Sequence, residues 1–304
     1  MTSVLGILNI DWQTLADAVG QGAVYALMAV GIGLVFGVLR LVNFAYGQLV
    51  MAGAFALALA SEWGWPVWAG IVFCFAVVMA LSVLMDRLVF RPLRSHSPAV
   101  MLAATFAVAF LLQSIALLWF GSLGKIAASL SSLNRPVTIG SVDIRKITIF
   151  SVVAAAVCLI LLVVLLERTA VGLHMRAAAL DFQTARLLGV NANRVIAAAV
   201  LVSGALAAVV SVILTVQNPL VTSGFALHDT IVVLAGVVVG GMTRLVSATL
   251  GGFAIGFVAG LLGGALPTEQ SQYVNSFLFG LVILVLLVRP DGVFSRGRGV
   301  VERV

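Results

Sequence analysis

Few residues of this chain have the types and spacing that catalysis or metal binding requires. Its three histidines, His96, His174 and His228, lie too far apart in the sequence for the closely spaced ligands of a zinc site. The chain also has no G-x-x-x-x-G-K-[ST] phosphate-binding loop, no H-E-x-x-H motif and no nucleophile elbow. We therefore expect a protein that is not an enzyme and that binds no metal or other cofactor itself.

Ionisable side chains inside the apolar stretches are equally scarce. Asp86, Glu167 and Glu269 lie at the ends of such stretches, and only the adjacent pair His228 and Asp229 could be drawn into one. Charged residues are costly inside a membrane and are kept there for function, for example in ion-coupled carriers. The pair fits either a polar helix start at the outer surface or a buried site. The scarcity favours a driving energy that comes from another protein.

A short polar interruption, NFAYGQ at residues 43–48, separates two apolar stretches in the first third of the chain. It is too short for an ordinary loop. It predicts either a broken or re-entrant helix, whose freed backbone must be buried or face a cavity, or a tight turn at the cytoplasmic surface. Polar residues within apolar surroundings are our candidates for a translocation path, namely Asn43, Tyr46, Gln48, Gln113 and Gln217.

Residues 168–194 form a long connection between two apolar stretches, and their composition is helical as far as Gly189. Asp181, Ala185 and Gly189 recur at four-residue intervals, so they would share one small and nearly featureless helical face. Such a face among arginines suits insertion into a groove of a cytoplasmic partner. A solvated amphipathic connector is the alternative.

Four glycines at four-residue spacing mark a later apolar stretch, at Gly252, Gly256, Gly260 and Gly264. Glycine along one helical face lets two backbones approach closely in a membrane. We expect this face to pack against a neighbouring helix, and the same close approach could also line a pathway.

The elements that must position these residues follow from the composition. Of 304 residues, 62% are apolar and 9% charged, against roughly 45–50% and 25% for a soluble domain. A membrane-spanning helix takes about 20 apolar residues, and the chain has eight or nine stretches near that length. We predict an all-α, polytopic transmembrane helical bundle of eight or nine spans, which forms a single domain over residues 1–304.

The uncharged stretches define the expected spans. The seventh has only 14 residues, about 21 Å of helix, so it either is re-entrant or begins earlier and carries His228 and Asp229 inward. The expected spans are 19–39, 44–61, 67–85, 98–120, 147–166, 195–217, 230–243, 245–266 and 273–288.

Basic residues set the expected orientation, because cytoplasmic loops are rich in lysine and arginine. The basic regions 87–94, 168–194 and 289–303 should share the cytoplasmic side, and the number of spans between them agrees with that. The C-terminus is then cytoplasmic and the segment 121–146 external. The N-terminus is also external if all nine stretches cross.

The net charge of +6 comes mainly from these loops. They lack the interleaved aromatic residues that stack on bases, so we expect a lipid bilayer and no nucleic acid as a partner. Trp63, Trp65 and Trp68 cluster where the second and third spans approach the outer surface, as interfacial aromatics do.

Together, these segments resemble the branched-chain amino acid ABC transporter permeases of the high-affinity uptake type. Residues 43–47 match the family's NFAHG element, 91–94 its RPLR-like loop, and 172–190 its cytoplasmic G-x-x-x-R-A…D-x-x-x-A-x-L-L-G-I stretch. The glycine-rich seventh and eighth spans and the R-P-D-G at 289–292 match as well. Five elements in the same order, over nearly the whole chain, make the resemblance specific.

The resemblance implies a multi-pass subunit of the bacterial inner membrane that belongs to an ATP-driven importer of leucine, isoleucine and valine. Its implied partners are two cytoplasmic ATPase subunits, which use the ATP, a second homologous permease and a periplasmic substrate-binding protein. Rigid-body rocking would alternate access to a cavity between the two permeases. The ATPase contact would lie on the 174–189 helix, at Arg176, Asp181, Ala185, Leu188 and Gly189.

Departures from the family pattern leave the substrate open. Tyr46 stands where the family usually has histidine, Leu180 where an acid is common, and GMTR at 241–244 replaces the more usual glycine–serine turn. Relatives of this architecture also carry urea, short amides or other amino acids, and the binding protein largely sets selectivity. Outside the family, the alternatives are an ion-coupled carrier that works alone and a scaffold subunit without a conduit.

Overall fold

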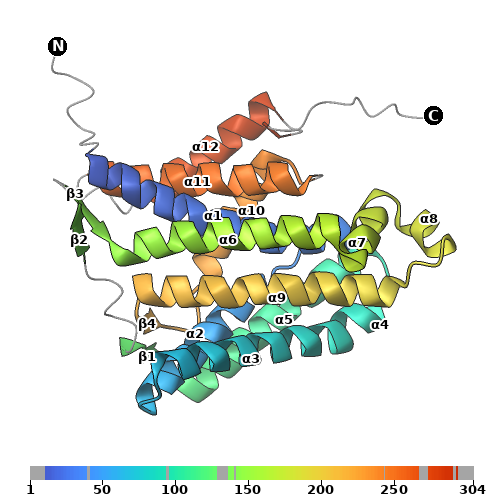
Figure 1. The fold of residues 1–304 in the computed structure, drawn as a ribbon, viewed down its shortest axis with the longest axis horizontal. Helices are drawn as coiled ribbons and strands as arrows, with labels where there is room; N and C mark the ends of the chain where they lie inside the picture. The colour runs from blue at the N-terminus through green and yellow to red at the C-terminus, as the bar shows by residue number, and fades with distance from the viewer. Residues whose placement is uncertain are drawn as a thin grey trace.

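The computed structural model describes residues 11–39, 42–93, 96–128, 136–139, 142–242, 244–266, 273–289 and 292–293. Within these ranges the chain is almost entirely helical, and most of the long helices run along the long axis of the molecule (Figure 1). In chain order, the helices are α1 Trp12–Leu39, α2 Tyr46–Glu62, α3 Val67–Met85, the π-helical turn η1 Asp86–Phe90, α4 Arg91–Leu93, α5 Pro98–Phe120, α6 Lys146–Arg168, α7 Ala170–Leu180, α8 Phe182–Leu187, α9 Ala192–Gln217, α10 Leu227–Gly240, α11 Leu245–Ala265 and α12 Val274–Val288.

One end of the bundle carries two short antiparallel sheets. There, β1 (Lys125–Ile126) pairs with β4 (Leu220–Val221), and β2 (Pro136–Ile139) pairs with β3 (Val142–Arg145). All tryptophans of the chain belong to this end and are exposed, in keeping with an interfacial aromatic belt. We call it the tryptophan end, after Trp12, Trp63, Trp65, Trp68 and Trp119.

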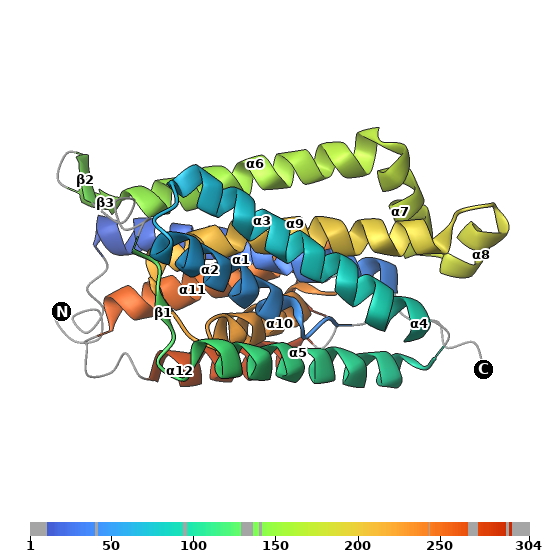
Figure 2. The same cartoon turned by 90° about the horizontal axis from the view of Figure 1, so that it is seen from below.

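The opposite end carries α4, α7 and α8 (Figure 2). Most arginines of the described ranges lie in these elements or at the ends of other helices, so we call it the basic end. They are Arg87, Arg91, Arg168, Arg176, Arg186, Arg194, Arg244 and Arg289.

Six helices of the described ranges are long and apolar enough to cross a membrane. They comprise α1, α3 continued through η1 and α4, α5, α6, α9 and α11. The apolar helices α10 and α12 are shorter, and α2 has 17 residues. This is the pattern of a polytopic helical membrane protein.

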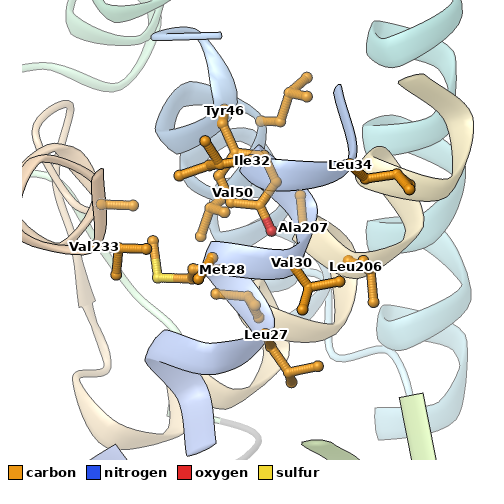
Figure 3. Packing of buried hydrophobic residues seen from close by; sticks show 14 of the residues in the cluster. Leu27, Met28, Val30, Ile32, Leu34, Tyr46, Val50, Leu206, Ala207 and Val233 are labelled. Carbon is orange, nitrogen blue, oxygen red and sulfur yellow. The ribbon is translucent and has the colours of Figure 1, made fainter. Parts of the chain in front are cut away.

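The core of the bundle surrounds α1, which is mainly buried, whereas α3, α5 and α6 are mainly exposed. Polar side chains of α9 join it to its neighbours: Ser203 Oγ donates to the Gly31 carbonyl of α1 at 2.7 Å, and Ser211 Oγ donates to the Val50 carbonyl of α2. Figure 3 shows the apolar packing among Leu27, Met28, Val30 and Ile32 of α1, Tyr46 and Val50 of α2, Leu206 and Ala207 of α9, and Val233 of α10.

Candidate functional site

The described part of the connection between α1 and α2, residues 42–45, lies against the bundle. Asn43 is 2% exposed and Ala45 is fully buried, which favours a broken helix over a turn at the surface. The Asn43 side chain substitutes for a helical partner, because its Oδ1 accepts the Ala45 amide at 3.1 Å. Phe44 stacks on Phe106 of α5, with ring centroids 3.9 Å apart. The break is therefore held by its own asparagine and by an aromatic contact.

Two polar side chains follow the break in the first turn of α2. Tyr46 packs against α1, where a Cβ at Gly31 would collide with its hydroxyl. Gln48 is 1% exposed. Neither the Tyr46 hydroxyl nor Gln48 Oε1 has a hydrogen-bond partner among the described residues. A buried polar atom without a partner costs about 1–3 kcal/mol, so a polar solute that bonded to either of these atoms would recover part of that cost.

The beginnings of α2 and α10 meet at this point. A Cβ at Gly47 would lie 3.0 Å from the Ala226 carbonyl and would also collide with Thr230 Oγ1. Ala226 and Thr230 are both buried, whereas Leu227 is 36% exposed, so one side of the first turn of α10 faces the start of α2 inside the bundle. Discontinuous helices that start inside a transporter present the positive ends of their dipoles to the interior, where substrates bind.

Asp229 lies in the first turn of α10, because the helix begins at Leu227. The Tyr25 hydroxyl of α1 donates to Asp229 Oδ1 at 2.7 Å, and the Gln21 side chain interacts with the same hydroxyl. The structure thus turns Asp229 toward the central helix. Sequence reasoning missed Tyr25 and Gln21, although Asp17, Gln21 and Tyr25 recur every four residues along α1.

The five candidates for a translocation path do not form one site. Asn43, Tyr46 and Gln48 lie together at the start of α2, and Gln113 is half-buried in α5. Gln217 lies at the end of α9 and lines a separate cleft of about 500 Å³ at the tryptophan end. That cleft lies between α1, α6 and α11.

The four regularly spaced glycines of α11 face α1, and we call them the glycine face. Added Cβ atoms at Gly252 and Gly256 would lie 2.3 Å from Ala29 Cβ and 2.7 Å from Tyr25 Cβ. Gly260 and Gly264 meet Ala18 and Thr14 in the same way. The two helices are therefore antiparallel, with their backbones in close approach along this whole length.

The predicted continuous helix over 174–189 is wrong. The chain leaves the helical conformation at Asp181, with φ −148° and ψ 106°, and forms the hairpin of α7 and α8. Asp181 itself caps α8: its Oδ1 accepts the Thr184 amide at 3.1 Å and its Oδ2 accepts the Thr184 hydroxyl at 2.6 Å. A capping aspartate competes with the helical backbone for its own amides, which explains the break.

The predicted small face of this segment is lost with the helix. Ala185 is 4% exposed, and Gly189 ends α8 in a left-handed conformation with φ +88°. The Val190 amide then donates to the Ala185 carbonyl at 3.0 Å, as in a Schellman cap. Asp181, Ala185 and Gly189 thus occupy a cap, a buried position and a turn.

The exposed surface of the hairpin is apolar and basic instead. Leu180, Leu187 and Leu188 are each at least 80% exposed, and Arg176 and Arg186 lie beside them in the sequence and are exposed as well. We call these five residues the hairpin surface. Arg176 and Leu188 were among the residues expected at the ATPase contact, whereas Leu180 and Leu187 were not, because their exposure depends on the break at Asp181.

Within the described part of the chain, no group of three or more histidine, cysteine, aspartate or glutamate side chains could hold a metal ion. His96 follows α4, His174 lies in α7 and His228 lies in α10.

Residues 14–287 match the family described as "Branched-chain amino acid transport system / permease component". The chain is 31% identical to the high-affinity branched-chain amino acid transport system permease protein BraD of Pseudomonas aeruginosa, over 96% of this chain and 97% of that protein. It is 28% identical to the permease protein LivH of Escherichia coli, with the same coverage. These relatives are named as permeases, which agrees with the expectation that the chain is not an enzyme.

Among solved structures, the fold resembles a chain of PsaBC from Streptococcus pneumoniae in complex with Fab. The TM-score is 0.50 at 14% identity, over 92% of this chain and 94% of that one. This likeness concerns the fold alone. The family match and the similarity to BraD settle the identification: this chain belongs to the family of branched-chain amino acid transport system permease components.

Proposed function

We propose that this chain is a transmembrane permease subunit of an ATP-driven importer for leucine, isoleucine and valine. The observation that carries the proposal is the similarity to BraD and LivH over 96% of the chain, since both are named for this transport. The sequence has no phosphate-binding loop, so ATP would be used by separate subunits.

For the topology, we propose nine crossings in the bacterial inner membrane. Six of these crossings are the long helices. The other three are α2, α10 and α12, which are shorter and would be completed by the irregular segments next to them. The arginines of the basic end support a cytoplasmic position for that end and for the C-terminus, and the tryptophan end would then face the periplasm.

For the assembly, we propose a second homologous permease, two cytoplasmic ATPase subunits and a periplasmic binding protein. The hairpin surface is our candidate for the ATPase contact, because exposed leucines beside arginines at the cytoplasmic end suit a groove in a soluble partner. Closure of the ATPase pair would move the hairpin and, through α7 and α9, the bundle.

For the path, we propose the start of α2 together with its contact on α10. Asn43, Tyr46 and Gln48 supply the polar groups, and the two helix beginnings supply partial positive charge for a carboxylate. Gln113 of α5 belongs to the same proposal, whereas Gln217 lines the separate cleft.

The test begins with purification of the tagged chain from its native membrane in mild detergent and identification of the proteins that accompany it. We then expect reconstituted complex to accumulate radiolabelled leucine only with ATP and the binding protein present. Unlabelled isoleucine and valine should compete, and urea and acetamide should not. A chain that purifies alone and transports without ATP would establish the ion-coupled carrier instead.

The path is tested by Gln48→Leu, which replaces the buried side-chain amide with an apolar group of similar volume. We expect uptake to fall about tenfold while the amount of folded protein stays the same, because Gln48 Oε1 has no partner to lose within the described residues. Thr215→Val is the matched control, since Thr215 is also buried with an unpaired oxygen but lies in α9. Equal uptake by both variants would remove Gln48 from the path.

A further inference from the structure

The cleft at the tryptophan end has the features of a binding site rather than of a packing defect. Its volume of about 500 Å³ lies within the range of about 300–1,000 Å³ that is typical of small-molecule sites, and its wall is largely polar. Both signs of charge line it, with Asp11 just before α1, Asp17 from α1 and Arg145 from the end of β3. The side-chain amides of Gln21 and Gln217 complete the polar wall.

The charged groups of the cleft are organised by direct contacts. Arg145 Nη2 donates to Asp17 Oδ2 at 3.1 Å, and Thr148 Oγ1 donates to Asp17 Oδ1 at 3.1 Å. The Arg145 side chain is 46% exposed, so its guanidinium, which has five N–H donors, can still bind a carboxylate. Asp11 is exposed on the same wall and can accept an ammonium group.

A row of polar side chains leads from the cleft into the bundle. Asp17, Gln21 and Tyr25 follow one another at four-residue intervals on α1, so they lie on the same side of the helix. Gln21 lines the cleft and interacts with the Tyr25 hydroxyl, which donates to Asp229. The row thus connects the cleft to the first turn of α10, one residue from the contact of Thr230 with the start of α2.

Glycine keeps the opposite wall of the cleft open. Gly263 of α11 lines it, and a Cβ at this position would meet no atom within 4 Å. This differs from Gly260 on the same helix, where a Cβ would lie 2.5 Å from Ala18 Cα. A larger side chain at residue 263 would therefore enter the cleft without disturbing the helix packing.

We propose that this cleft binds a free α-amino acid as a zwitterion, within a single permease subunit. Arg145 takes the carboxylate, the carboxylates of Asp11 and Asp17 take the ammonium group, and the row from Gln21 to Asp229 leads onward to the start of α10. The site is separate from the path at α2 and rests on the proposed function only for the choice of leucine as the probe.

The experiment measures binding of radiolabelled leucine to the purified complex in nanodiscs of phosphatidylcholine, with no binding protein present. We expect saturable binding that leucinamide and 4-methylpentanoate, which each lack one charge, displace at least about tenfold less well than unlabelled leucine. Gly263→Leu should abolish this binding. The control Gly280→Leu, on α12 with equally open space, should bind like the wild type.

Three results would overturn the proposal. They are no saturable binding up to about 10 mM leucine, unchanged binding by Gly263→Leu, or loss of binding in nanodiscs of phosphatidylethanolamine. The last result would identify a lipid headgroup, with its own ammonium and anionic group, as the occupant.

The same variants separate this site from the proposed function. Binding that survives Gln48→Leu but not Gly263→Leu assigns it to the cleft and not to the path at α2. If the complex imports leucine and Gly263→Leu binds it normally, the cleft proposal fails and the importer stands. If the complex imports no branched-chain amino acid but binds leucine only when residue 263 is glycine, the importer fails and the cleft stands.

Discussion

The α1–α11 pair and the α7–α8 hairpin both carry small residues at four-residue intervals, yet only the first brings them onto one surface. Along α11, four glycines lie in one row against α1. In the hairpin, Asp181, Ala185 and Gly189 are separated by a helix break, a buried position and a left-handed turn. A four-residue spacing therefore defines a contact face only where the helix is continuous, and an aspartate that can cap the following turn is enough to interrupt it.

The two regions also differ in what covers them. The glycine face is closed by a helix of the same chain, whereas the hairpin surface presents three leucines that none of the described residues covers. Substitutions in the first region should affect folding. Substitutions in the second should affect association with a partner, and this contrast can be tested directly.

The largest effect should come from Gly256→Leu on the glycine face. Its Cβ would lie 2.7 Å from Tyr25 Cβ and 2.8 Å from the Gln21 carbonyl, so α1 and α11 would have to separate. Overpacking of this kind costs about 1–3 kcal/mol when side chains can yield, and more when backbone must move. We expect little or no monodisperse protein by size-exclusion chromatography of detergent extracts.

Gly280→Leu is the control for this substitution, because a Cβ at Gly280 meets no atom within 4 Å. Its yield should match that of the wild type. If Gly256→Leu also folds normally, the glycines of α11 do not determine its packing against α1.

The second effect concerns the hairpin surface, in the double variant Leu187→Glu, Leu188→Glu. Both side chains are at least 80% exposed, so the folded permease should change in stability by no more than about 0.5 kcal/mol. The two glutamates would be buried in the docking groove, so recovery of the ATPase subunits should fall at least about tenfold. This corresponds to a loss of about 1.4 kcal/mol in binding free energy. The measurement is quantitative mass spectrometry of the purified complex.

Leu123→Glu provides the comparison at the tryptophan end, where Leu123 is 88% exposed. This variant should keep its ATPase subunits. If the wild type, the double variant and Leu123→Glu all recovered the same amount of ATPase subunits, the hairpin surface would not be the docking site.

Most helices could be predicted from the sequence, because an uncharged stretch of about 20 residues is enough to predict a membrane-spanning helix. The stretches 67–85 and 98–120 coincide with α3 and α5, and Pro98 is the first residue of α5, where a helix needs no N–H donor. The sequence leaves two alternatives for the connection at residues 43–48, and the burial of Asn43 in the structure favours the broken helix.

The cleft and the pairing of Tyr25 with Asp229 could not be predicted in this way. Each brings together residues more than a hundred positions apart, such as Asp17 with Arg145 and Tyr25 with Asp229. A single sequence shows that these residues are polar, but only the packing of the helices shows that they meet. The break at Asp181 is different, since Asp181 and Thr184 form a local capping pattern that the sequence already contains.

The third effect comes from Gly189→Arg. A contact face at residue 189 and a left-handed turn there predict different causes for the loss. If a small face at residue 189 inserted into the partner, the length of the arginine would block docking. In the structure a Cβ there meets no atom within 4 Å, and the cost arises from φ +88°, at about 1–2 kcal/mol for a residue with a side chain. Gly189→Asn should therefore be much milder, because asparagine adopts this conformation more easily.

The two variants at residue 189 are compared by the thermal stability of the complex and by ATPase recovery. We expect Gly189→Arg to lower both modestly and Gly189→Asn to leave both near the wild type. If both variants lost ATPase docking completely, residue 189 would lie in the ATPase contact itself.

The smallest effect, and the most direct test of why the two regions differ, is expected from Asp181→Ala. It removes both oxygens that Thr184 uses, so α8 should lose about 1 kcal/mol of capping stabilisation. The amides of residues 182–187 should then exchange hydrogen about fivefold faster, while those of α11 stay unchanged. Asp181→Asn retains an acceptor and should behave like the wild type. If Asp181→Ala instead slows exchange through residues 180–183, α7 and α8 have merged into one helix. The aspartate alone would then separate a hairpin from a continuous small-residue face like that of α11.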